Sequence, residues 1–291
     1  MTSTERLDLS IIVLTWNSAS FIPDCFRSLE RAVQGIGHEI IVVDNGSRDD
    51  GLRLLCSIVQ RARVIRNTTN RGVAAARNQG LAAAIGRYLW LLDVDTRFLD
   101  GDMKALIRFM DRNRDVGLAG CRLVYLDGST QRSCRKFPTV TSKLCRRLQG
   151  PRLGRWQAAE DYDPETASVQ EVDYVIGAYQ LIRREAFQAI GYLDEGIFYG
   201  PEDVDYCLRL WKGGWRVIYY PHVSVLHYEQ RITQRHLLSR ITWEHVVGLL
   251  HYFRKHGYWF SREKLYRATM ACRQAAPATD PGWIPGAGPQ R

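Results

Sequence analysis

The stretch LSIIVLTWN at residues 9–17 begins with six almost wholly apolar residues and then becomes polar. A short apolar run of this kind predicts a strand that is buried on both faces of a sheet. Three similar runs follow it, at Glu39–Val43, Arg63–Arg66 and Arg87–Leu92. Apolar residues at helical spacing fill the intervals, at Ala19–Ala32, Asp50–Gln60 and Val73–Ile85. Strands that alternate with helices predict an α/β fold, in which a mostly parallel sheet carries helices on both faces.

The remainder of the chain continues the alternation less regularly. Helices are predicted at Asp102–Arg112, Glu185–Ile190 and Asp203–Lys212. Strands are predicted at Gly117–Val124, Trp215–Tyr220 and Val223–His227, with an extended segment at Val172–Arg183. Residues 128–171 are polar and weakly periodic, which predicts loops with short helices. Two or three amphipathic helices are expected within residues 231–274, followed by a proline-rich, disordered tail at residues 275–291.

The composition is that of an ordinary soluble globular protein. Of the 291 residues, 45% are hydrophobic and 24% are charged, which excludes a disordered, collagen-like or disulfide-stapled chain. The seven cysteines are an odd number without zinc-site spacing, so reduced, packed thiols are expected. No leader-like apolar run opens the chain, and no stretch reaches the roughly 18 apolar residues of a spanning helix. We therefore expect a cytoplasmic protein, whose membrane contact would be peripheral, on the inner face of the cell membrane.

The formal net charge of +9 comes from two basic segments. Residues 132–155 contain eight basic residues and no acidic one, and residues 230–273 contain nine basic and two acidic residues. The remainder of the chain is therefore mildly acidic. A basic patch indicates an anionic partner, which is nucleic acid, a phospholipid surface or a phosphorylated small molecule.

Polar residues cluster where the predicted parallel strands end, and such sheets bind their ligands at this edge. Thr15 and Asn17 follow the first strand, and Asp44 and Asn45 follow the second. A carboxylate at Asp44 can accept a hydrogen bond from a ring N–H, so this turn suits the base and ribose of a pyrimidine nucleotide. An ordinary strand-to-helix turn with an N-cap explains the same residues equally well.

Asp93 and Asp95 follow the fourth strand as an Asp-x-Asp pair. Side chains two apart on an extended chain project to the same side, so both carboxylates can approach one divalent cation that also binds diphosphate oxygens. The alternative is a pair of strand-end carboxylates that cap the next turn. Arg77 lies on the Ala-rich helix that follows Asn70-Arg71-Gly72. It is expected either to face the cleft and pair with phosphate or base oxygens, or to be an ordinary solvated arginine.

Three acidic residues, Glu202, Asp203 and Asp205, begin a predicted helix. Acidic residues favour the positive end of the helix dipole, which is one explanation for them. The other is a general base, since direct transfer of a group to a hydroxyl needs a carboxylate that removes the proton. His227 ends a strand, and a lone histidine is more often a core or surface residue than a metal ligand.

Several signatures of other enzyme classes are absent from the sequence. No Gly-x-Gly-x-x-Gly follows the first strand, and neither a Walker A sequence nor Gly-x-Ser-x-Gly occurs. Their absence disfavours dinucleotide-dependent redox, NTPase and α/β-hydrolase chemistry.

Taken in order, the motifs resemble those of the family 2 inverting glycosyltransferases. These have the Rossmann-like GT-A fold, and the resemblance is greatest to bacterial rhamnosyltransferase-type enzymes of surface-polysaccharide assembly. It covers about residues 9–228 and rests on the segments Ile11–Asn17, Ile41–Ser47, Asn70–Gly80, Leu91–Asp95, Gly177–Arg184 and Glu202–Asp205. The segment Tyr252–His256 adds a resemblance to enzymes that use dTDP-L-rhamnose.

The resemblance implies a role for each matching position. Donor-nucleotide binding falls to Thr15, Asn17, Asp44, Asn45, Arg77 and Asp93. Asp95 and His227 would hold Mg²⁺ or Mn²⁺, and Asp203 would be the catalytic base, with Glu202 as the competing candidate. Residues 1–125 would then form the nucleotide-sugar half of one domain, and residues 126–230 the half that holds the base and a glycan or polyprenyl-pyrophosphate-linked acceptor.

Other interpretations remain open. A transferase of the same fold could use a UDP- or GDP-sugar, and a non-catalytic sugar- or lipid-binding module could share the fold, although it would not need a base. Nucleic-acid binding by the aromatic-rich second basic segment is disfavoured, because its pattern fits a membrane-surface helix better. From Ile241 onward that helix either lies on an anionic membrane surface or packs on the catalytic domain.

Overall fold

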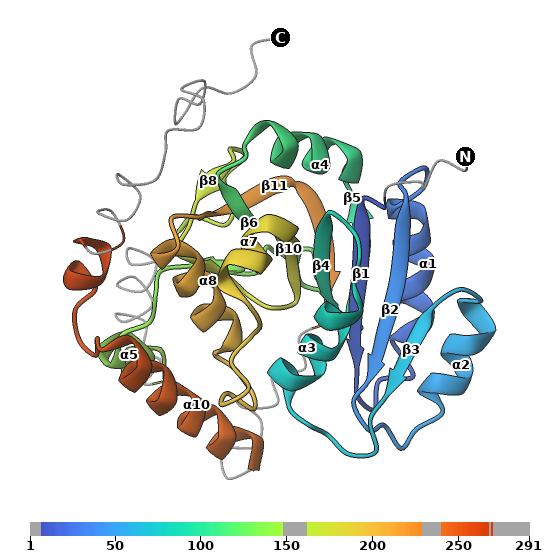
Figure 1. Ribbon diagram of the computed structural model, residues 1–291, viewed down its shortest axis with the longest axis horizontal. Coiled ribbons are helices and arrows are strands. Elements are labelled where there is room, and N and C mark those ends of the chain that lie inside the picture. Colours follow the sequence, from blue (N-terminus) through green and yellow to red (C-terminus); the bar gives the residue numbers. More distant parts are fainter. Residues whose placement is uncertain (1–6, 148–161, 229–239, 268, 270–291) are drawn as a thin grey trace.

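The computed structural model describes residues 7–147, 162–228, 240–267 and 269, which form a central sheet with helices on both faces (Figure 1). The strands are β1 (Leu9–Thr15), β2 (His38–Asp44), β3 (Arg63–Arg66), β4 (Tyr88–Asp93), β5 (Thr96–Asp100), β6 (Val116–Val124), β7 (Cys134–Arg135), β8 (Gln170–Glu171), β9 (Tyr174–Val175), β10 (Tyr179–Arg183) and β11 (Arg216–His227). The helices are α1 (Ile22–Ala32), α2 (Gly51–Ile58), α3 (Val73–Ala83), α4 (Met103–Arg112), α5 (Val140–Arg147), α7 (Arg184–Ile190), α8 (Glu202–Lys212) and α10 (Arg240–His256). The sheet order is β3-β2-β1-β4-β10-β6-β11-β5, with β8 beside β11, while β7 and β9 form a separate pair.

The N-terminal half of the sheet confirms the sequence prediction. β3, β2, β1 and β4 are adjacent and all parallel. Side chains alternate along β1, so Ile11 and Val13 belong to one hydrophobic core and Ile12 to the other. This two-sided burial explains why β1 is almost wholly apolar. Gly80 allows α3 to lie close to the sheet, because a Cβ at this position would clash with the Ile12 side chain.

The strand register places the polar strand ends together. Thr15 at the end of β1 is opposite Asp44 at the end of β2. On the other side of β1, Leu14 is opposite Asp93 at the end of β4. The turns after these three strands therefore meet at one edge of the sheet, where an open α/β sheet binds its ligand.

Two antiparallel pairings, which the sequence did not predict, surround this edge. β10 runs antiparallel to β4, so the turn before it brings Gly177 beside Asp93, whose backbone N donates to the Ala178 carbonyl at 3.2 Å. β5 runs antiparallel to β11, which puts His227 opposite Thr96. Apolar periodicity indicates which residues are buried but not the direction of pairing, so neither contact was visible in the sequence.

β11 is one strand of 12 residues, where the sequence predicted two. Its register against β6 shifts between Tyr220 and Ser224. Pro221 lies inside this shift, and proline has no N–H to donate to a neighbouring strand. The strand therefore continues through a local irregularity and carries His227 to the ligand-binding edge.

α10 packs on the domain, which is one of the two positions that the sequence analysis left open for this helix. Tyr252 and Phe253 are buried in the core that also contains residues of α8. A Cβ on Gly248 would approach the Gly200 carbonyl at 3.1 Å, so the helix lies close to the loop before α8. The other predicted helical residues at 231–239 and 270–274, and the predicted tail at 275–291, lie outside the described residues.

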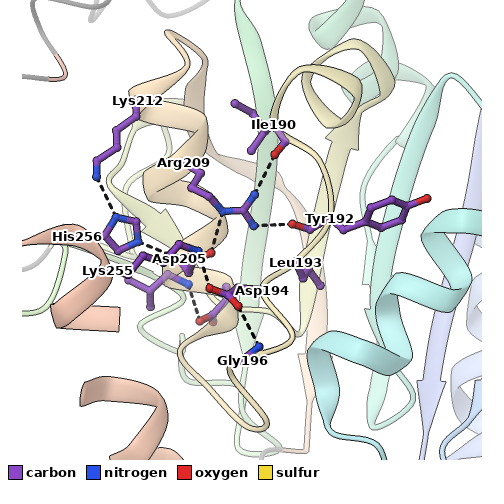
Figure 2. A network of polar contacts seen from close by, with 12 residues as sticks. Ile190, Tyr192, Leu193, Asp194, Gly196, Asp205, Arg209, Lys212, Lys255 and His256 are labelled. Carbon is purple, nitrogen blue, oxygen red and sulfur yellow. Dashed lines mark hydrogen bonds and ion pairs between the residues drawn. The ribbon is translucent and has the colours of Figure 1, made fainter. Parts of the chain in front are cut away.

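An ion-pair network fixes α10 to α8 (Figure 2). Asp205 on α8 is fully buried, and it accepts from His256 Nε2 at 2.8 Å and from Arg209 Nε at 2.8 Å. Lys255 Nζ lies 2.7 Å from Asp205 and 2.6 Å from Asp194. Burial alone would raise the pKa of Asp205, but the bonds and charges of His256, Arg209 and Lys255 outweigh burial and lower it. The carboxylate therefore stays ionised and joins the two helices.

Replacing Asp205 by asparagine should reduce the free energy of unfolding by about 3 kcal/mol, because Arg209 and Lys255 lose a buried partner. Urea unfolding measures this loss. The matched control is Asp50→Asn, whose partner Arg53 is 82% exposed, and it should cost less than about 0.5 kcal/mol. Equal losses in the two variants would show that the network does not hold α10 in place.

Candidate active site

The carboxyl ends of the parallel strands open into a cleft lined by side chains from distant parts of the sequence. The sequence-predicted residues that line it are Arg77, Asp93, Asp95, Glu202, Asp203 and His227. They come from α3, from the end of β4 and the residues after it, from the start of α8 and from the end of β11. The antiparallel pairings of β10 and β5 bring these elements together. β10 begins beside the end of β4, and β5, which begins directly after Asp95, pairs with the end of β11.

Asp93, Asp95 and His227 form a cluster with the geometry of a cation site. One ligand atom from each lies within 4.8 Å of the others, and His227 Nε2 is 3.8 Å from Asp95 Oδ1. Within the ranges that the structure describes, no second group of three His, Cys, Asp or Glu side chains converges in this way. Carboxylate oxygens suit a divalent cation of the Mg²⁺ or Mn²⁺ type, and an imidazole can complete its coordination shell. The residues present therefore fit the cation that the sequence predicted.

Arg77 is a buried guanidinium that connects the cation cluster with the acidic residues of α8. Its Nη2 donates to Asp93 Oδ1 at 2.6 Å and to the Gly177 carbonyl at 2.8 Å, and its Nη1 lies 3.6 Å from Glu202 Oε1. Burial alone would lower its pKa, but the charges of Asp93 and Glu202 outweigh burial and raise it. Among the described residues, Nε and Nη1 find no hydrogen-bond partner, so a ligand in the cleft can use them.

Glycine at position 177 is required for this arrangement. A Cβ there would lie 2.6 Å from Arg77 Nη1, so any larger residue would displace the guanidinium. The same peptide contacts the other side of the cleft, because the Gly177 N–H donates to Asp203 Oδ2 at 2.9 Å. One residue thus fixes both the arginine and a candidate base.

Glu202 and Asp203 are neighbouring carboxylates at the start of α8. Burial, and then repulsion from Asp203, raise the pKa of Glu202 to about 7. Burial also raises the pKa of Asp203, although the N–H groups of Val204 and Gly177 donate to its two oxygens and favour the charged form. These two hydrogen bonds fix the orientation of the Asp203 carboxylate. Glu202 Oε2, by contrast, is buried without a hydrogen-bond partner in the described part of the chain.

The residues predicted to hold the nucleotide base lie beside the cleft and are not among those that line it: Thr15, Asn17, Asp44 and Asn45. Trp16 and Ser18, which flank Asn17, do line it. Asn17 Oδ1 accepts from the Arg48 N–H at 2.8 Å, and this contact joins the turn after β1 to the turn after β2. The buried Asp44 carboxylate accepts from the Ser47 N–H at 3.0 Å within the second turn.

The amide of Asn45 is fully used by the protein. Its Nδ2 donates to Asn70 Oδ1 and to the Gly72 carbonyl, at 3.0 and 3.2 Å. Its Oδ1 accepts from the Arg71 N–H and from Asn67 Nδ2, at 3.0 and 3.1 Å. These bonds attach the Asn-Arg-Gly turn to the end of β2, so Asn45 positions the start of α3.

The cleft is also lined by residues that the sequence did not single out as site residues, among them Arg135, Lys143, Tyr199 and His245. His245 belongs to α10, and burial lowers its pKa to about 4, so its ring is neutral. The ring of Tyr199 packs edge-on to it with centroids 6.4 Å apart. Arg135 and Lys143 lie in the first basic segment, residues 132–155, and this charge pattern was the one sequence feature that pointed to them. His245 had none, because only the packing of α10 brings it to the cleft.

Known proteins resemble this chain over most of its length. A sequence model of glycosyl transferase family 2 matches residues 10–191. The N-acetylglucosaminyl-diphospho-decaprenol L-rhamnosyltransferase of Mycobacterium tuberculosis is 25% identical over 265 residues, which cover 87% of this chain and 86% of that protein. The pre-mycofactocin glycosyltransferase of the same organism is 30% identical over 239 residues, which cover 80% of this chain and 45% of that protein.

Solved structures resemble the fold. GalNAc-T7 with UDP, GalNAc and Mn²⁺ aligns with a TM-score of 0.63 at 15% identity, over 94% of this chain and 59% of that one. The mannosyltransferase PcManGT from Pyrobaculum calidifontis, in complex with GDP-Man and Mn²⁺, aligns with a TM-score of 0.58 at 17% identity, over 93% of this chain and 70% of that one. At such identities the likeness establishes the fold alone, and it confirms the GT-A fold.

Proposed function

This chain belongs to glycosyl transferase family 2 and is a glycosyltransferase with the GT-A fold, and we propose that it transfers a sugar from a nucleotide sugar to a lipid-linked glycan. One observation supports this most. The cation cluster of Asp93, Asp95 and His227 shares one cleft with the carboxylates Glu202 and Asp203. Transfer with inversion needs charge compensation at the leaving diphosphate and a base for the acceptor. A non-catalytic binding module would have no use for buried carboxylates on the second side.

The donor nucleotide would bind along the ends of β1, β2 and β4. Asp44 is proposed to accept a hydrogen bond from the base, with Thr15 and Asn17 beside it. Asn45 would support the turn instead of touching the nucleotide, because its amide is already used. Arg77 would donate to the diphosphate or base oxygens through Nε and Nη1, and Asp93 would hold it in place.

Asp93, Asp95 and His227 would hold Mg²⁺ or Mn²⁺. When bound, such a cation compensates negative charge on a leaving diphosphate. Both solved relatives described above contain Mn²⁺, which supports a metal of this class.

Asp203 is the proposed base. Its two backbone hydrogen bonds keep the carboxylate oriented, and its raised pKa brings it closer to neutral pH, where a general base is most effective. Asp203 would take the proton of the acceptor hydroxyl as that oxygen attacks the anomeric carbon. The bond from this carbon to the diphosphate oxygen breaks in the same step, and the configuration inverts. Glu202 remains the competing candidate because it lies next to Asp203.

The proposed donor is dTDP-L-rhamnose and the proposed acceptor is a polyprenyl-diphosphate-linked glycan. The support comes from the Mycobacterium tuberculosis relative that aligns over most of this chain and most of its own length. By its name, that relative is an L-rhamnosyltransferase that acts on N-acetylglucosaminyl-diphospho-decaprenol. A UDP- or GDP-sugar is the alternative, since the two solved relatives contain UDP and GDP-Man.

A thermal-shift screen tests the donor and the metal together. The protein is heated with dTDP-L-rhamnose, UDP-GalNAc or GDP-mannose, each with and without Mn²⁺ or Mg²⁺. A ligand at 100 times its Kd stabilises the native state by about 2.7 kcal/mol, so the correct donor with metal should raise the midpoint by about 5 °C. Asp95→Ala should remove the part of the midpoint shift that depends on the metal. A larger shift with another sugar nucleotide would reassign the donor, and no shift with any of them would contradict the proposal.

We also propose that the outer face of α10 contacts an anionic membrane. Trp243, Val247 and Leu250 are 68, 41 and 45% exposed, and their spacing places them on one face of the helix. The exposed Arg254 continues that face. An exposed apolar stripe next to a basic residue is typical of a helix that lies at a membrane surface. Within the described residues, none of the helices combines the length and the apolar character needed to cross a bilayer.

Sedimentation with liposomes tests this contact. We expect the protein to bind vesicles that contain phosphatidylglycerol at low salt, to bind neutral vesicles weakly, and to dissociate at high salt. The double variant Trp243→Ser and Leu250→Ser should lose most of the binding. The control is Ile85→Ser, which removes a side chain that is also 68% exposed. Ile85 lies beside Ser10 at the start of β1, the end opposite the cleft, so this variant should bind vesicles like the unchanged protein. Absence of binding at low salt would rule out the membrane contact.

A further inference from the structure

We infer that Gln131 is a positioning residue for the cation site, because it fixes the tautomer of His227 so that Nε2 presents a lone pair towards Asp95. The inference rests on the proposed cation site. It concerns a residue that touches neither the reacting atoms nor the other two ligands of the cluster.

The hydrogen bonds of Gln131 determine the orientation of its amide. Its Nε2 lies 2.8 Å from the His227 carbonyl oxygen and 3.5 Å from the Val124 carbonyl oxygen. Carbonyl oxygens only accept hydrogen bonds, so the nitrogen of the amide must be the atom that faces them. The amide oxygen Oε1 therefore points the other way, where it lies 3.0 Å from His227 Nδ1.

This orientation assigns the proton on the His227 ring. An amide oxygen can only accept, so Nδ1 must carry the hydrogen that joins the two side chains. A neutral imidazole has one N–H, and Nε2 is then left with its lone pair. Nε2 is the nitrogen that lies 3.8 Å from Asp95 Oδ1. A metal ligand needs this tautomer, and the partner of the distal nitrogen usually fixes it.

Without the glutamine, the opposite tautomer of His227 would gain an electrostatic attraction. A proton on Nε2 would point towards the Asp95 carboxylate, which lies 3.8 Å away. That proton would take up the lone pair with which Nε2 can bind a cation. Gln131 therefore disfavours the tautomer that cannot bind a cation through Nε2.

The backbone holds Gln131 firmly in this position. The side chain is almost fully buried, and its own N–H donates to the Leu123 carbonyl on β6 at 2.7 Å. The residue therefore bridges β6 and the end of β11, two strands that are neighbours in the sheet. Gln131 lies in residues 128–171, which the sequence predicted as loops, so no periodic pattern pointed to it.

The test is a titration of the metal-free protein with Mn²⁺ alone, followed by electron paramagnetic resonance. Gln131→Met keeps the side-chain volume but removes the hydrogen bonds to His227 and Val124, and it should weaken Mn²⁺ binding by about 10-fold or more. Gln131→Glu keeps an acceptor for Nδ1 but loses the donor to the His227 carbonyl, so its Mn²⁺ affinity should lie between those of the unchanged protein and Gln131→Met. The control is Gln180→Met, which removes a buried amide bonded to the Val175 carbonyl and should leave Mn²⁺ affinity unchanged.

A second measurement needs no variant. Imidazole ¹⁵N resonances of the metal-free, unchanged protein distinguish the two tautomers, and we expect His227 to carry its proton on Nδ1. A proton on Nε2, or Mn²⁺ binding that depends on Asp95 but not on Gln131, would overturn this inference and leave the proposed function intact. Mn²⁺ binding that is unaffected by Asp95→Ala would instead contradict the proposed cation site itself.

Discussion

Asp203→Asn should lower kcat by about 10³-fold and leave nucleotide-sugar binding nearly unchanged. The amide has the shape of the carboxylate but cannot take the proton of an acceptor hydroxyl at neutral pH. Donor binding should persist, because Arg77 and the Asp93–Asp95 cluster do not need a charge at position 203. Single-turnover transfer to a lipid-linked acceptor measures the chemical step, and calorimetry with the donor measures binding.

Glu202→Gln is the matched control for this prediction. It removes the neighbouring carboxylate and weakens the contact with Arg77 Nη1, which is an ion pair at 3.6 Å, so a loss of about tenfold is expected. If Asp203→Asn retained full activity and Glu202→Gln lost it, Glu202 would be the base. Loss of donor binding in Asp203→Asn would show that the asparagine disturbs the cleft, since both Asp203 oxygens accept backbone N–H groups that an amide nitrogen cannot accept.

The parallel half of the fold could be predicted from the sequence, because its buried strands are short, continuous apolar segments. β1 and β4 are buried on both faces, so their residues are almost wholly apolar, and the polar residues after them mark the strand ends. The positions of β5 and β10 depend on pairing between distant segments. A short strand such as Thr96–Asp100 has a mixed composition, and its identity as a strand comes from its partner β11.

The candidate site divides in the same way. Asp93, Asp95 and Asp203, which line the cleft, could be singled out because acidic residues at a strand end or helix start form a recognisable motif. Asn45 was predicted to bind the nucleotide, whereas in the structure its amide bonds to Asn67 and to the Asn-Arg-Gly turn, and no sequence pattern indicated these contacts. His245 has no motif around it, because its place in the cleft depends on how α10 packs.

Arg77→Met should reduce the free energy of unfolding by about 3–5 kcal/mol and abolish transfer. Arg77 is the buried cation between Asp93 and Glu202, and methionine of similar length would leave these carboxylates without compensation. The loss should depend on pH. The pKa of Glu202 is already raised to about 7 by burial, so the folded state binds a proton more readily than the unfolded chain does between about pH 4.5 and pH 7. A carboxyl group of this kind loses its stabilising effect as the pH rises through that range.

Without Arg77, the Glu202 carboxyl group should hold its proton still more firmly. The loss of free energy of unfolding in Arg77→Met should therefore be larger at pH 8 than at pH 5. Urea unfolding at both pH values measures this difference. Adding Glu202→Gln to Arg77→Met should recover part of the stability, because a neutral amide needs no counter-charge. Arg53→Met, which breaks an exposed pair with Asp50, should cost less than about 0.5 kcal/mol at either pH. A small, pH-independent loss in Arg77→Met would mean that the carboxylates of this cleft are hydrated and do not depend on the guanidinium.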